Sequence, residues 1–174
     1  VIIDYESNTG NTMALIIETG AIIADANSFT TDAEFVTYAA LRGFTIPATE
    51  SERNTLQIKA VDYLFSKELS MKGARVSALQ TLMYPRKGAD ANGFGIASTV
   101  IPISLKSAQL ELAVQSYASE LLISSTTQNL ASIDVEGVYS ESYFSGGSWE
   151  RVRTERADAY LNPLLINNGS INVM

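Results

Sequence analysis

Residues 102–122 read PISLKSAQLELAVQSYASELL and carry the clearest helical period in the chain. Apolar and small residues recur there every seven positions, on two different faces of a helix. One face carries Ile103, Leu110 and Tyr117 together with Ser107, Val114 and Leu121, and the other carries Leu105 and Leu112. A helix with two apolar faces contacts neighbours on more than one side. This segment is therefore predicted to be the central helix of a bundle, with Pro102 near its first turn.

Two capping boxes predict the helices that precede this segment. Residues 31–34 read TDAE and open a helix that Gly43 closes, and residues 49–52 read TESE and open a longer helix to about Leu69. A third, short helix is predicted over residues 77–83, where Tyr84-Pro85 would stop it. In the loop that follows, Asn92-Gly93 is typical of a tight turn with positive φ.

The pattern changes after the central helix. Alternating apolar residues from 133 to 144, interrupted by Gly137, predict one or two strands, and residues 151–161 return to a helical pattern that Pro163 ends. The chain is thus predicted to be mainly α, a helical bundle of about four to five helices with a small β-hairpin element and extended termini. Residues 1–12 are predicted to be an N-terminal arm, residues 13–161 one domain, and residues 162–174 a C-terminal docking tail.

Composition excludes most classes of enzyme and most cofactors. The 174 residues include 0 Cys and 0 His, which excludes disulfides, thiolate zinc sites, Ser-His-Asp triads and a histidine general base. No nucleotide-binding glycine motif occurs, and the turn at Asp90-Ala91-Asn92-Gly93 lacks the further ligands of a calcium loop. We therefore expect a protein that is not an enzyme and that uses no cofactor and no metal ion.

The net charge of -7 argues against general binding of nucleic acids, because it repels phosphate backbones over most of the surface. Only residues 59–87 are basic, at +4, between flanks of -6 and -5. The longest apolar runs are too short to span a membrane, and no secretion signal is visible. We expect no secretion from the cell and no contact with a membrane.

Three clusters are candidate interface residues. The first comprises Tyr84, Arg86 and Lys87, which have the chemistry to stack a base and hold a phosphate, or to make an arginine-mediated protein contact. In a third interpretation, Tyr84 packs into the core and Arg86 is solvated. The second cluster comprises Trp149 and Arg151, after a glycine-rich turn. The third comprises Leu164, Leu165 and Ile166 in the predicted docking tail.

An ordered series of short motifs resembles a family of tailed-bacteriophage proteins labelled DnaT-like single-stranded-DNA-binding proteins. Its most specific members are QTLMYPR at residues 80–86 and VIP at residues 100–102, and the others lie at residues 13–20, 24–29, 39–43, 60–64, 105–108, 133–136 and 138–140. The resemblance covers about residues 13–165. The chain departs from it in the extension 1–12, in a long polar tail, and in Tyr84 at a position where the family pattern has Trp.

The resemblance implies the head-to-tail connector, or adaptor, class of virion proteins, so that residues 13–161 would be the connector domain. Such a protein forms a ring, a dodecamer in this class, between the portal protein and the tail or nozzle proteins. Packaged DNA passes through the lumen of the ring without specific binding, which an acidic lining permits. The expected location is the neck of the virion, after assembly in the host cytoplasm. The alternative is a phage single-stranded-DNA-binding protein.

Overall fold

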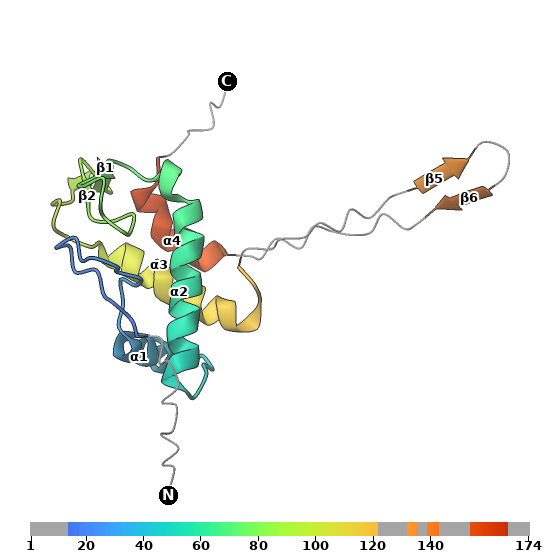
Figure 1. Ribbon diagram of the computed structural model, residues 1–174, viewed down its shortest axis with the longest axis horizontal. Helices are drawn as coiled ribbons and strands as arrows, with labels where there is room; N and C mark the ends of the chain where they lie inside the picture. Colours follow the sequence, from blue (N-terminus) through green and yellow to red (C-terminus); the bar gives the residue numbers. More distant parts are fainter. Residues whose placement is uncertain (1–13, 122–131, 136–138, 143–153, 167–174) are drawn as a thin grey trace, which may run out of the picture.

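The computed structural model describes residues 14–121, 132–135, 139–142 and 154–166, and within these ranges the chain is mainly helical (Figure 1). The helices are α1 (Asp32–Arg42), α2 (Glu50–Ser66), α3 (Ile103–Ala118) and α4 (Glu155–Leu161), with 3-10 turns η1 (Glu68–Ser70) and η2 (Asn162–Leu164). The long helix α2 has α1 near its N-terminal end and the small strands β1 and β2 near its C-terminal end (Figure 1). The predicted fold class, a helical bundle with small β elements, is confirmed.

All strands of the described residues form two-stranded antiparallel pairs. β1 (Ala74–Arg75) pairs with β2 (Arg86–Lys87), β3 (Asp90–Ala91) with β4 (Phe94–Gly95), and β5 (Ser132–Val135) with β6 (Tyr139–Ser142). The turn between β3 and β4 is Asn92-Gly93, with φ angles of 52° and 84°, as its sequence predicts. The strands predicted after residue 132 are also present, as β5 and β6.

The helix termini follow the predicted caps. The Thr31 hydroxyl accepts from the Glu34 amide, the Glu34 carboxylate accepts from the Thr31 amide at 2.7 Å, and Gly43 closes α1 with a φ of 67°. The hydroxyl of Thr49 accepts from the Glu52 amide at the start of α2. α2 ends at Ser66 rather than near Leu69, because the chain tightens there into η1.

The central helix of the bundle is α3, which packs against α1, α2 and α4. Its fully buried face carries Leu105 and Leu112, whereas Ile103 is 82% exposed and Tyr117 is 52% exposed. The prediction that the stripe of Ile103, Leu110 and Tyr117 is buried is therefore wrong at its two ends and right at Leu110. A straight helix drifts by about 20° per seven residues, so a heptad stripe leaves the buried face along its length.

The helix predicted over residues 77–83 is wrong. Side chains satisfy the backbone there instead of helical hydrogen bonds. The Ser77 hydroxyl accepts from the Leu79 amide at 3.2 Å, and the Gln80 side-chain oxygen accepts from the Ser77 amide at 3.0 Å. The Gln80 side-chain nitrogen donates to the carbonyls of Leu82 and Pro85. This segment is a loop held in shape by Gln80.

Residues 162–166, at the start of the predicted docking tail, pack against the body of the protein. Leu164 is fully buried, and its carbonyl accepts from the Lys72 amide at 2.9 Å. The Ile166 amide donates to the Ser70 carbonyl at 2.7 Å, and Leu165 bridges to Met71. These contacts join residues 162–166 to the segment after α2. The arm 1–12 and the rest of the tail, residues 167–174, lie outside the described residues.

Candidate interaction site

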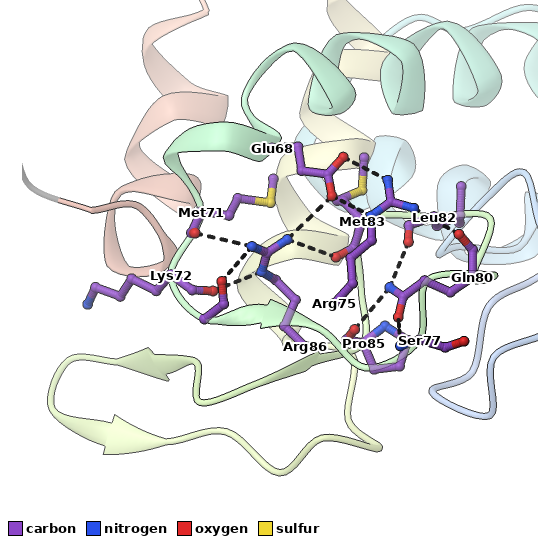
Figure 2. A network of polar contacts seen from close by, with 11 residues as sticks. Glu68, Met71, Lys72, Arg75, Ser77, Gln80, Leu82, Met83, Pro85 and Arg86 are labelled. Carbon is purple, nitrogen blue, oxygen red and sulfur yellow. Dashed lines mark hydrogen bonds and ion pairs between the residues drawn. The ribbon is translucent and has the colours of Figure 1, made fainter.

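Two of the three residues in the first predicted cluster are interior residues. Tyr84 is fully buried and Arg86 is 6% exposed, so neither offers a surface to a partner. The Arg86 guanidinium donates to the backbone carbonyls of Gly73 at 2.6 Å and Lys72 at 2.9 Å (Figure 2). It also donates to the carbonyls of Met71 and Met83, each at 3.3 Å. Of the third interpretation, the packing of Tyr84 into the core is confirmed and the solvation of Arg86 is wrong. The guanidinium of Arg86 instead organises the loop around it through its several hydrogen-bond donors.

Glu68 completes this network. Its carboxylate accepts two hydrogen bonds from the Arg75 guanidinium, at 2.6 and 2.7 Å, and lies 3.5 Å from that of Arg86 (Figure 2). The hydrogen bonds from Arg75, with the nearby charge of Arg86, lower the pKa of the Glu68 carboxyl below its usual value. Arg75 also donates to the Gln80 carbonyl. Because the guanidinium donors of Arg75 and Arg86 are used within the chain, the network has a structural role. Of the three residues in the first predicted cluster, only Lys87 is exposed.

The remaining predicted interface residues fall in different places. Leu164 is buried, Leu165 is packed against the core, and Ile166 is 53% exposed. Trp149 and Arg151 lie outside the described residues. The structure therefore leaves Lys87 and Ile166 as the exposed members of the predicted set within the described ranges.

Most cations of the described residues are used in ion pairs within the chain. Seven of the ten lysines and arginines there form ion pairs: Arg53, Lys59, Lys72, Arg75, Arg86, Lys106 and Arg156. The Lys106 pair joins α3 to Glu34 of α1 at 2.8 Å. Burial alone would raise the pKa of the Glu34 carboxyl, but hydrogen bonds from Lys106 and the Thr31 amide lower it below its usual value. Few cations of the described surface remain available to phosphates.

Sequence reasoning missed a cavity where the end of α1, α3 and α4 meet. It measures about 420 Å³ and is lined by Arg42, Phe44, Glu111, Arg156, Ala159 and Tyr160. These residues come from three separate segments of the chain. No sequence signal identifies them as a group, because only the packing of α4 on α3 brings Arg156 near Arg42.

The polar contacts of the cavity leave its two arginines accessible. The buried Glu111 carboxylate accepts from the Tyr38 hydroxyl at 2.7 Å and lies 3.3 Å from the guanidinium of Arg156. The Arg156 side chain is nevertheless 72% exposed. The Arg42 guanidinium lies 3.6 Å above the centre of the Tyr38 ring, and among the described residues it has no ion-pair partner.

The same cavity has aromatic walls. The Arg156 guanidinium lies 5.6 Å from the centre of the Phe44 ring, and Tyr160 also lines the cavity. Burial, together with the hydrogen bond to Glu111, raises the pKa of the Tyr38 hydroxyl, so Tyr38 remains a donor at physiological pH. Two guanidiniums beside aromatic rings can bind an anionic group attached to an apolar one. The described residues hold no cluster of carboxylates that could bind a metal ion.

Large apolar side chains are also exposed on the described surface. Those more than three-quarters exposed are Leu41, Leu69, Leu79, Phe94 and Ile103. Single exposed apolar residues are ordinary, but side chains of this size are the ones that protein interfaces bury. Within the described residues, no helix has the length and apolar character needed to cross a membrane.

Comparison with known protein families gives a match over nearly the whole chain. The family model described as "Putative DnaT-like ssDNA binding protein" matches residues 13–174, which is all of the chain except its first twelve residues. No curated protein and no solved structure matches the chain significantly.

Proposed function

The chain belongs to this DnaT-like family, and within it we propose that the protein is a structural virion protein of a tailed bacteriophage. It forms a ring between the portal and the tail, joins the head to the tail and extends the DNA channel. Its partners are the portal protein on one side and tail or nozzle proteins on the other. The subunit assembles in the host cytoplasm and resides in the neck of the virion. The phage assignment rests on the sequence resemblance described above.

The distribution of cations on the described surface carries this proposal. A protein that binds single-stranded DNA combines a continuous basic groove with aromatic platforms for successive bases. Here the net charge is -7 and seven of the ten described cations are neutralised by carboxylates of the same chain. Highly exposed apolar side chains such as Leu69 and Phe94 fit contacts with other protein subunits instead. An acidic ring also lets DNA slide through its lumen without adhering.

Single-stranded-DNA binding is the second candidate. The family description favours it, and so does the cavity in which Arg42 and Arg156 lie beside the Phe44 ring. That cavity could hold one nucleotide, with a phosphate on the guanidiniums and a base on the ring. A single nucleotide site gives weak binding, because each phosphate contact adds only a part of the affinity.

Two measurements on the full chain separate these candidates. Native mass spectrometry and negative-stain electron microscopy should show closed rings, and antibody labelling of virions should place the protein at the neck. Fluorescence anisotropy with a labelled oligothymidylate should show no tight binding near physiological salt, about 0.15 M. A monomer that binds the oligonucleotide with nanomolar affinity, and that loses this binding as salt is raised, would instead establish the DNA-binding function.

A further inference from the structure

We propose that the cavity lined by Arg42, Phe44, Glu111, Arg156, Ala159 and Tyr160 binds an exposed carboxylate side chain of a second copy of this chain. This inference rests on the proposed function, because it assigns one contact of the ring. The cavity, of about 420 Å³, has room for the carboxylate of an acidic side chain and for apolar groups next to it.

The charges around the cavity select an anion. Arg42 and Arg156 contribute two positive charges, and Glu111 contributes one negative charge. The Glu111 side chain is only 8% exposed and already accepts from Tyr38 and pairs with Arg156. Arg42 forms no ion pair with a carboxylate of the described residues, and the side chain of Arg156 is 72% exposed. The mouth of the cavity is therefore locally positive on a protein whose net charge is -7.

The arrangement favours one discrete anion over a nucleic-acid strand. A strand presents a phosphate at every nucleotide and needs cations along its path. Outside this cavity, the described cations without an ion pair are Lys67 and Lys87, which lie on other elements, after α2 and in β2. A single carboxylate needs only the two arginines of the cavity. Guanidiniums also match the planar geometry of a carboxylate, through two parallel hydrogen bonds.

A second copy of the chain supplies suitable carboxylates. Asp25, Glu50, Asp62 and Glu155 are exposed and form no ion pair within the described residues. Since one copy offers these free acids and one accessible pair of arginines, two copies are complementary where an acid of one meets the cavity of the next. Such a contact joins two different surfaces of the chain, and an interface of this type forms a closed ring when the rotation between neighbouring subunits closes.

The cavity is lined by residue types that occur at the centre of protein interfaces. Leu41 is 79% exposed and adjoins Arg42 at the end of α1. Arginine and aromatic residues are the types most often found at energetically dominant positions of interfaces. Burial of Leu41 by a neighbouring subunit would add apolar contact area to the interface.

The first test measures self-association of the full chain by sedimentation and native mass spectrometry. The double variant Arg42→Gln/Arg156→Gln should weaken association at least about tenfold, which corresponds to about 1.4 kcal/mol. The control Lys67→Gln/Lys87→Gln loses the same charge at two cations that lie outside the cavity and form no ion pair within the described residues, and it should assemble like the wild type. Arg42→Gln alone leaves both contacts of Glu111 in place and loses only the contacts of Arg42 with Tyr38, so it should weaken assembly while costing no more than about 1 kcal/mol of stability.

The second test identifies the partner group. In Arg42→Lys the cation is kept as a primary amine, which can form an amide with a neighbouring carboxylate that a carbodiimide has activated, with release of the urea. With a mixture of isotopically light and heavy chains, mass spectrometry should find a cross-link from position 42 to an Asp or Glu of another copy. A cross-link found only within one chain would overturn the inference.

The outcomes of the two tests separate the inference from the proposed function. Rings that form equally well in the double variant would overturn the cavity assignment and leave the ring intact. A wild-type chain that stays monomeric at every concentration would overturn both. Oligothymidylate binding that is lost in the double variant and kept in the lysine control would assign the cavity to a phosphate and overturn the inference.

Discussion

Tyr84 is a core residue with an unpaired polar group. It is fully buried, and its hydroxyl has no hydrogen-bond partner among the described residues. Burial raises the pKa of this hydroxyl, so it stays neutral. An unpaired buried hydroxyl lowers stability, because it loses its hydrogen bonds to water and gains none.

Tyr84→Phe should therefore leave the free energy of unfolding unchanged or raise it by up to about 1–2 kcal/mol, as measured by chemical denaturation. The matched control is Tyr63→Phe, since the Tyr63 hydroxyl lies 2.9 Å from that of Thr154 and is buried. Removing that hydrogen bond should cost about 1 kcal/mol. A loss of more than 1 kcal/mol in Tyr84→Phe would mean that its hydroxyl has a partner.

Glu68 makes stability depend on pH. Its pKa in the folded protein is lowered from the ordinary value of 4.5, chiefly by the hydrogen bonds from Arg75. A lowered folded pKa means that the stabilisation is fully present above about pH 4.5 and is lost as the pH falls through the folded value. Glu68→Gln should cost about 1–3 kcal/mol near pH 7 and reduce the acid dependence of unfolding.

The control for Glu68 is Glu120→Gln, which removes the ion pair between Glu120 and Lys59. The side chain of Glu120 is 69% exposed. Exposed pairs of this kind contribute little, about 0–1 kcal/mol. Parallel acid titrations of the two variants, followed by circular dichroism, check the difference. Equal pH profiles for Glu68→Gln and the wild type would contradict the role given to Glu68.

At the scale of elements, α3 decides the packing of the bundle. Leu112 is fully buried, whereas Ile103 at the start of the same helix is 82% exposed. Leu112→Ala should lower the free energy of unfolding by about 2–5 kcal/mol, because it leaves a cavity among the helices. Ile103→Ala should change it by less than about 0.5 kcal/mol. Thermal and chemical denaturation measure both, and a large loss in Ile103→Ala would mean that this position is covered in solution.

At the scale of the whole molecule, the C-terminal segment closes the body beside the end of α2. Removal of residues 162–174 deletes the fully buried Leu164 and its backbone bond to Lys72, so the stability should fall by about 2–5 kcal/mol. Removal of residues 167–174 alone keeps these contacts and should leave the melting temperature unchanged. If both truncations melt like the wild type, the contacts of residues 162–166 do not stabilise the body.

Most helix caps and turns of this protein could be predicted from the amino-acid sequence. The box at Thr31 to Glu34, the left-handed Gly43 and the Asn92-Gly93 turn all formed as predicted, because each depends on atoms only a few residues apart. The mainly helical class followed from periodicity in the same way. The helix predicted over residues 77–83 failed because the Gln80 side chain bonds the backbone of that segment instead.

Which side chains are interior, and which of them form a site, depends on the packing of distant segments and could not be predicted. Arg86 reads as a surface cation in the sequence, but the carbonyls of residues 71–73 converge on its guanidinium and bury it. Leu164 reads as a tail residue, yet the chain folds it against the segment after α2. Arg42 and Arg156 meet at one cavity only because α4 packs on α3. Burial and proximity depend on segments far apart in the chain, which no local pattern encodes.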